Sequence, residues 1–215
     1  MGDVTAAGGP PDPGPTPGDR RERLGLLGGT FDPPHLGHLA AARSARRELD
    51  LDRVLLVVAN DPWQKAPRRR VTAAEDRMAM VEAACAGVDG VEASRLEIDR
   101  GGPSYTVDTV RELGRLHPGA RLLLLVGADV AGELDTWHDV DELSGLVTLV
   151  IVDRGGIDRV DDPPGWRVER LRIPALDVSS SELRDRLATG RSVDFLIPEA
   201  AILCMARLGL YAGPR

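Results

Sequence analysis

The chain has 215 residues, of which 42% are hydrophobic and 28% charged, and its formal net charge at pH 7 is −7. This length and composition predict one soluble globular domain, and no apolar run is long enough to span a bilayer, so no membrane association is expected. The negative charge argues against a nucleic-acid-binding protein, because phosphate neutralisation needs a basic face.

The first 21 residues differ in composition from the rest. They are rich in proline and glycine, and Val4 is the one large apolar residue after the initial methionine. Such a segment cannot bury enough apolar surface to offset the entropy lost on ordering. We therefore predict a disordered tail over residues 1–21 and a single folded domain over residues 22–215. No basic segment followed by an apolar stretch marks a secretion signal, so a cytoplasmic protein is expected.

Apolar strands and amphipathic helices alternate after the tail. In chain order, the pattern predicts a strand at residues 23–29, a helix at 36–49, a strand at 54–59, a helix at 72–86, a weak strand at 91–94, a helix at 106–116, strands at 121–126, 147–152 and 168–171, and helices at 179–188 and 198–208. Two of the helix starts have capping-box spacing, Thr72 with Glu75 and Ser179 with Glu182. Thr72 and Ser179 are therefore the predicted N-caps.

Continuous apolar strands separated by helices are typical of a parallel sheet whose two faces are both covered. The predicted fold is α/β, a Rossmann-like doubly wound parallel sheet with helices on both faces. In such sheets, ligands bind outside the carboxyl ends of the strands, near the point where the strand order reverses. We expect this edge to be formed by the loops at residues 28–37, 60–71, 95–105, 127–138 and 153–165, with the serines at 179–181.

The first of these loops begins the string GGTFDPPHLGH at residues 28–38. Gly28 and Gly29 let a ligand approach the main chain with no Cβ in the way, and they allow a positive φ in a tight turn. His35 and His38 project from the first turn of the next helix, where free N–H groups and the helix dipole favour an anion. Gly37 keeps the surface between them low. The pattern indicates a phosphate site, and it differs from the GxGxxG dinucleotide fingerprint.

The two histidines in isolation are also compatible with ordinary surface or core positions, or with a metal site. Zinc would need a third or fourth ligand, and no nearby cysteine or HExxH frame supplies one, so no metal ligand is assigned. Cys85 and Cys204 lie in apolar helical patterns without His or Cys neighbours, and buried free thiols are expected there. The three arginines at 68–70 are expected in a solvated loop.

The full string resembles the signature GTFDPxHxGH of the HxGH nucleotidyltransferases, and within them the bacterial nicotinate mononucleotide adenylyltransferases. Four later strings resemble further motifs of that family: PWQK at 62–65, GGPSYTVDTVREL at 101–113, VGADVAGELDTWHDVDEL at 126–143 and VSSSELRDRL at 178–187. The resemblance covers residues 24–210. Val178 and Ser181 stand where the family usually has Ile and Thr, and IVDRGG stands in place of a more frequent RPG.

The resemblance implies a step of NAD biosynthesis in which ATP, bound to Mg²⁺, and nicotinate mononucleotide give nicotinate adenine dinucleotide and pyrophosphate. The attacking phosphate is already an anion, so the reaction needs aligned phosphates and hydrogen-bond donors more than a general base. The residues implied as catalytic are His35, His38, Lys65 and Arg184. Those implied in ATP binding are Gly28, Gly29, Thr30, Phe31, His35, His38, Gly127, Asp129, Ser180 and Arg184. Those implied in mononucleotide binding are Gly29, Thr30, Phe31, Lys65, Tyr105, Thr106 and Trp137.

Aromatic side chains favour a planar ligand at the same edge, because Phe31, Trp63, Tyr105 and Trp137 fall in the predicted loops. Trp63 and Trp137 are also compatible with capping the core edge, and Asp129 with a helix N-cap. Alternative functions are adenylyl transfer to nicotinamide mononucleotide or to another HxGH-family substrate, and a non-catalytic nucleotide sensor. Phosphopantetheine adenylyltransferases usually have threonine in place of the first histidine. A homo-oligomer and the acid-versus-amide selectivity ratio are left open.

Overall fold

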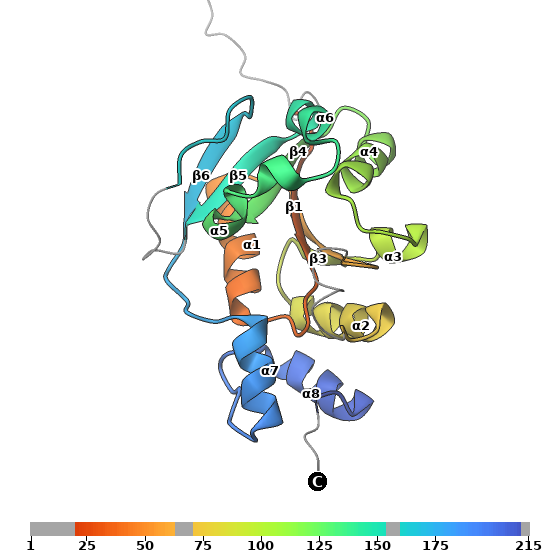
Figure 1. Cartoon of the computed structure of the whole chain (residues 1–215), viewed down its shortest axis with the longest axis vertical. Helices are drawn as coiled ribbons and strands as arrows, with labels where there is room; N and C mark the ends of the chain where they lie inside the picture. The colour runs from red at the N-terminus through yellow and green to blue at the C-terminus, as the bar shows by residue number, and fades with distance from the viewer. Residues whose placement is uncertain (1–19, 63–70, 154–159, 212–215) are drawn as a thin grey trace, which may run out of the picture.

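The computed structural model describes residues 20–62, 71–153 and 160–211, and these form a six-stranded parallel sheet (Figure 1). The strands are β1 (Arg23–Gly29), β2 (Arg53–Val58), β3 (Val91–Ser94), β4 (Arg121–Gly127), β5 (Thr148–Asp153) and β6 (Val168–Arg172). Their order is β3-β2-β1-β4-β5-β6, and every neighbouring pair is parallel. The doubly wound α/β prediction is therefore confirmed. The strand order reverses between β1 and β4, which makes their carboxyl ends the switch point.

Helices connect the strands and cover the sheet. They are α1 (Leu36–Glu48), α2 (Ala74–Cys85), α3 (Leu96–Arg100), α4 (Thr106–Leu116), α5 (Ala128–Ala131), η1 (Leu134–Thr136), α6 (Val140–Leu146), α7 (Ser180–Ala188) and α8 (Glu199–Leu208). The long helices agree with the sequence prediction to within one or two residues at each end. The short elements α3, α5 and η1 lie in segments predicted as loops, because so few residues show no helical periodicity.

One of the two predicted helix caps is correct and the other is wrong. Ser179 is the N-cap of α7, and its hydroxyl accepts a hydrogen bond from the backbone N–H of Glu182 at 3.2 Å. Thr72 is not the N-cap of α2, which follows Ala73. The carbonyl of Thr72 instead accepts a hydrogen bond from Arg77 Nε at 2.8 Å. Thr72, which the spacing predicted as the N-cap, is therefore bound by the side chain of a residue within α2.

Alternate side chains of the strands build a separate core on each face of the sheet. In β2, Val54, Leu56 and Val58 pack on the side of α1 and α2, while Leu55 and Val57 pack on the side of α4, α5 and α6. A third cluster joins the outer side of α2 to α7 and α8 (Figure 1). The two C-terminal helices therefore reach the sheet through α2, and they bring α7 close to the loop that follows β1.

Both cysteines are buried free thiols, as predicted. Cys204 belongs to the cluster between α2 and α8, and Cys85, the last residue of α2, packs in the core between that helix and the sheet. Burial raises the pKa of the Cys85 thiol to about 11. This thiol is therefore protonated at neutral pH, and a thiol is a much weaker nucleophile than a thiolate.

Some sequence predictions fall outside the described residues. These are the tail over residues 1–19, Trp63, Lys65 and the arginines at 68–70. At the start of the described chain, Arg20 Nη1 lies 3.1 Å from a carboxylate oxygen of Asp50. Within the described ranges, no helix combines the length and apolar character needed to cross a membrane.

Candidate active site

A cavity of about 440 Å³ opens at the carboxyl ends of β1 and β4, at the switch point. Its walls come from the loop after β1, the N-terminal ends of α1, α4 and α7, and the segment between β4 and α6. The predicted site residues that line it are Gly28, Gly29, Thr30, Phe31, His35, His38, Tyr105, Thr106, Gly127, Asp129, Trp137, Ser180 and Arg184. Lys65 lies outside the described residues. Every other predicted site residue is thus brought to one cavity.

The two glycines at the end of β1 have different surroundings. A Cβ added at Gly28 would meet no atom within 4 Å, which leaves the main chain there open to a ligand. A Cβ at Gly29 would lie 2.9 Å from Cζ of Phe31, so this glycine makes room for the buried phenyl ring. Neither glycine uses the positive φ that glycine allows; in this turn it is Phe31 that has a positive φ, of 51°. An aromatic residue in this region is strained, and packing on Gly29 helps to hold it.

The two histidines form a stacked pair at the start of α1. His35 is the extended N-cap residue, and its backbone N–H donates to Nδ1 of His38 at 3.1 Å. The ring centroids lie 3.6 Å apart with 23° between the planes. Because Nδ1 of His38 accepts a hydrogen bond, a neutral His38 ring carries its proton on Nε2. His38 therefore offers an N–H donor from Nε2.

Neighbouring residues fix the orientation of this pair. The Phe31 ring meets His38 edge-on, with centroids 4.8 Å apart and 74° between the planes. A Cβ at Gly37 would lie 3.0 Å from Nδ1 of His35 and 3.2 Å from Cγ1 of Val178. Because residue 37 has no Cβ, the His35 ring can pack closely between α1 and Val178. The spacing HxGH thus has a steric basis as well as a chemical one.

The N-terminal end of α7 is tied to the loop that carries the prolines. Ser180 Oγ donates to the carbonyl of Pro33 at 2.8 Å, and Arg184 Nη1 donates to the carbonyl of Asp32 at 2.7 Å. Arg184 Nη2 also donates to Ser181 Oγ at 3.0 Å. A guanidinium and a helix N-terminus therefore line the cavity together with the histidine pair, an arrangement that suits an anion.

Asp32 and Tyr211 form a link that the sequence reading did not find. Asp32 is 1% exposed, and its carboxylate accepts a hydrogen bond from the Tyr211 hydroxyl. Burial, followed by the hydrogen bond to Asp32, raises the pKa of Tyr211. The sequence does point to Asp32, since it lies inside the GGTFDPPHLGH motif. It does not point to Tyr211, because no local pattern marks a tyrosine that contacts a residue 179 positions away.

Arg77 is a second residue that the sequence reading missed. It is 1% exposed, and its guanidinium donates to four backbone carbonyls. The distances are 2.9 Å to Thr30, 2.6 Å to Ala59, 3.1 Å to Asn60 and 2.8 Å to Thr72. One side chain therefore connects the loop after β1, the end of β2 and the approach to α2. A buried arginine in a helix gives no pattern that separates it from a solvated one.

The opposite wall is aromatic. Tyr105 is the N-cap residue of α4, and its ring stacks on His138 with centroids 4.4 Å apart. Trp137 lines the cavity and also packs against the core, while its stacking on a planar ligand stays a prediction. Its buried indole N–H has no acceptor among the described residues. Asp129 lies in the first turn of α5, whose N-cap is Gly127, so the N-cap reading of Asp129 is wrong.

Comparisons with known proteins show which family and which fold this chain resembles. The model of the family described as cytidylyltransferase-like matches residues 26–186. A Corynebacterium kroppenstedtii protein named probable nicotinate-nucleotide adenylyltransferase is 42% identical over 192 residues, which cover 88% of this chain and 90% of that protein. A Gemmatimonas aurantiaca protein of the same name is 43% identical over 197 residues, covering 88% and 92%. The fold resembles that of Plasmodium falciparum nicotinic acid mononucleotide adenylyltransferase complexed with NaAD, with TM-score 0.74, 19% identity and coverage of 89% and 98%.

Proposed function

The chain belongs to the cytidylyltransferase-like family, and from that premise we propose that it is a nicotinate-nucleotide adenylyltransferase. It joins ATP and nicotinate mononucleotide to form nicotinate adenine dinucleotide, and it releases pyrophosphate. The observation that carries the proposal is the stacked pair of histidines lining a cavity at the switch point. Relatives that are 42% and 43% identical over 88% of the chain carry the corresponding name.

In the proposed reaction, an oxygen of the mononucleotide phosphate attacks the α-phosphorus of ATP. A new P–O bond forms, and the bond from the α-phosphorus to the oxygen bridging to the β-phosphate breaks. The nucleophile is already an anion at neutral pH, so the protein has to align two phosphates and stabilise charge on the leaving group. ATP enters as its magnesium complex. The oxygens of the triphosphate are proposed to hold the metal.

The phosphates of ATP are proposed to bind between the histidine pair and α7. Nε2 of His38 donates to the α-phosphate, where charge develops in the transition state. His35, Ser180 and Arg184 contact the β- and γ-phosphates from the two sides, and Lys65 adds a further charge. Bonds to Asp32 and Ser181 orient the Arg184 guanidinium before the nucleotide binds, which reduces the entropy lost on binding. Gly28, Thr30, Gly127 and Asp129 form the adenosine side of the same cavity.

The mononucleotide is proposed to bind at the aromatic wall. The pyridine ring stacks on Trp137, and Tyr105, Thr106 and the backbone at the start of α4 bind the ring carboxylate. Gly29, Thr30 and Phe31 lie between this subsite and the histidine pair, next to the phosphate that attacks.

Pyrophosphate release from MgATP tests the function directly. The purified chain is given nicotinate mononucleotide, nicotinamide mononucleotide or phosphopantetheine as the acceptor. We expect the fastest release, by kcat/KM, with nicotinate mononucleotide, together with formation of nicotinate adenine dinucleotide. Faster release with phosphopantetheine would overturn the proposal. ATP binding measured by calorimetry, with no release for any acceptor, would identify a nucleotide sensor instead.

A further inference from the structure

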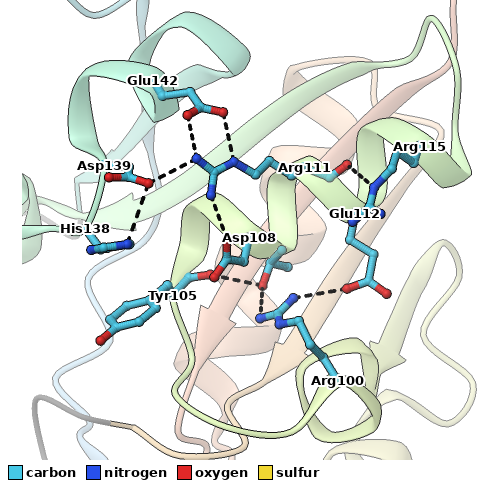
Figure 2. A network of polar contacts seen from close by, with 10 residues as sticks. Arg100, Tyr105, Asp108, Arg111, Glu112, Arg115, His138, Asp139 and Glu142 are labelled. Atoms are coloured by element: carbon cyan, nitrogen blue, oxygen red, sulfur yellow. Dashed lines mark hydrogen bonds and ion pairs between the residues drawn. The ribbon is translucent and has the colours of Figure 1, made fainter.

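His138 occupies a place in the aromatic wall that the function above does not use. It follows Trp137, and its ring lies on Tyr105 with centroids 4.4 Å apart and 28° between the planes. Both rings line the cavity, together with Thr106. Nε2 of His138 is 3.6 Å from a carboxylate oxygen of Asp139 (Figure 2). An ionisable ring is thus held beside the proposed pyridine subsite.

Asp139, the carboxylate beside the His138 ring, belongs to a network of ion pairs. Arg111 of α4 lies 2.7 Å from Asp108, 3.0 Å from Asp139 and 2.5 Å from Glu142, and Figure 2 shows its guanidinium surrounded by the three carboxylates. Asp139 is the N-cap residue of α6. Arg111 therefore connects the start of α6 to α4, the helix that carries Tyr105. The three carboxylates outnumber its single positive charge, and their hydrogen bonds raise the pKa of Arg111 further.

The charges that line the cavity are unevenly distributed. His35, His38 and Arg184 lie at the end formed by α1 and α7. At the aromatic end, within residues 20–62, 71–153 and 160–211, His138 is the basic side chain that lines the cavity. Glu97 also lines it, but it is 7% exposed and its carboxylate accepts a hydrogen bond from Thr109 Oγ1 at 2.6 Å. Among the residues that the structure describes, a positive charge at the aromatic end therefore depends on His138.

We propose that His138 is a specificity-determining residue, and that its imidazolium favours a mononucleotide with a ring carboxylate over one with a ring amide. This inference rests on the proposed function. The two mononucleotides differ at that substituent by one negative charge, so a nearby cation discriminates between them. The groups that face the ring are Tyr105, Asp139 and, through Asp139, Arg111 with Asp108 and Glu142. The carboxylates of Asp32, Glu97 and Asp129 belong to residues that line the same cavity.

The sign and size of the effect follow from exposure and charge. The His138 side chain is 50% exposed, so solvent screens its interaction with a carboxylate. Exposed ion pairs of this kind change an equilibrium by about threefold to fivefold. Because a cation near the ring substituent favours the acid, the preference for the acid should follow the charge on His138.

The test is the ratio of kcat/KM for nicotinate mononucleotide to kcat/KM for nicotinamide mononucleotide, measured from pH 6 to pH 9. Ionisation of ATP, of the shared phosphate and of the other histidines affects both substrates, and the ratio removes it. A lost stacking contact at Tyr105 cancels in the same way. Where turnover of nicotinamide mononucleotide is too slow to measure, its inhibition constant as a competitor of nicotinate mononucleotide replaces its kcat/KM.

In the unmodified chain, we expect the ratio to fall by about threefold to fivefold between the two pH limits. His138→Gln should give a low ratio at every pH, and His138→Arg a high one at every pH. The matched control is His117→Gln, which changes a histidine outside the cavity that lies 3.0 Å from Glu22, and it should keep the profile of the unmodified chain.

A ratio that does not change with pH in the unmodified chain would overturn the inference, as would a His138→Gln chain that retains the pH profile. Turnover of nicotinate mononucleotide in these same experiments would leave the proposed function standing. An unmodified chain that transfers adenylate to neither mononucleotide would overturn both. The two failures are therefore distinguishable.

Discussion

His38 has two nitrogen atoms with separate tasks, and two substitutions separate them. Nδ1 accepts the backbone N–H of His35 at 3.1 Å, and Nε2 is the proposed donor to the α-phosphate. In His38→Asn, the amide oxygen can take the place of Nδ1, while nothing replaces Nε2. In His38→Ala, both atoms are lost. The asparagine variant should therefore lose the chemistry and keep the helix start, whereas the alanine variant should lose both.

The magnitudes follow from these two bonds. Removing one donor to developing charge lowers kcat by about 10²–10³-fold. Removing the side-chain acceptor at the helix start costs about 1 kcal/mol, which lowers Tm by about 2–4 °C in a protein of this size. We therefore expect both variants to lose about 10²–10³-fold in kcat, and only His38→Ala to show the loss in Tm.

Pyrophosphate release at saturating MgATP and nicotinate mononucleotide gives kcat, and thermal unfolding of the same preparations gives Tm. A His38→Asn chain with near-normal kcat would show that Nε2 is not the donor. A His38→Ala chain with unchanged Tm would show that the bond to Nδ1 does not stabilise the helix start, and the assigned tautomer would lose its basis.

Four further outcomes follow from the contacts described above. Arg77→Met leaves four carbonyls without their donor, so the free energy of unfolding in urea should fall by about 3–5 kcal/mol, and an unchanged midpoint would contradict the role of Arg77. Gly37→Ala should lower kcat with little change in urea stability, because its Cβ would press on His35; normal kcat would show that the ring can move freely. Trp137→Ala should raise KM for the mononucleotide more than KM for ATP, and equal changes would argue against stacking. The raised pKa of Cys85 contributes stability that is fully present below about pH 9 and is lost as pH rises toward about 11, so urea midpoints should fall over that interval, and Cys85→Ala should show a smaller fall.

The fold could be predicted because its strands are buried on both faces and therefore read as continuous apolar runs, of which residues 122–126 are the clearest. The site could be predicted because parallel strands send their carboxyl ends to one edge, so His35, Tyr105 and Ser180 meet although they are far apart in the sequence. The family resemblance added the roles of these residues, which geometry alone would not have supplied.

The rest of the site could not be predicted because it depends on contacts without a local pattern. The four carbonyls bound by Arg77 have no sequence signature, and α5 and η1, with four and three residues, are too short to show periodicity. Thr72 had the spacing of a cap, but its hydroxyl donates at 3.5 Å to the hydroxyl of Tyr211, 139 positions further along the chain. In each case tertiary contacts determine the structure, and the local sequence pattern does not reveal those contacts.

The hydrogen bond between Tyr211 and Asp32 joins residues that are 179 positions apart in the sequence. During synthesis, the ribosome makes the GGTFDPPHLGH motif well before Tyr211, whose hydroxyl binds Asp32 of that motif. A nascent chain can assemble the whole sheet while Asp32 still lacks this donor. Substitutions at Tyr211 should therefore disturb the candidate site around Asp32, although the two residues are made at different times.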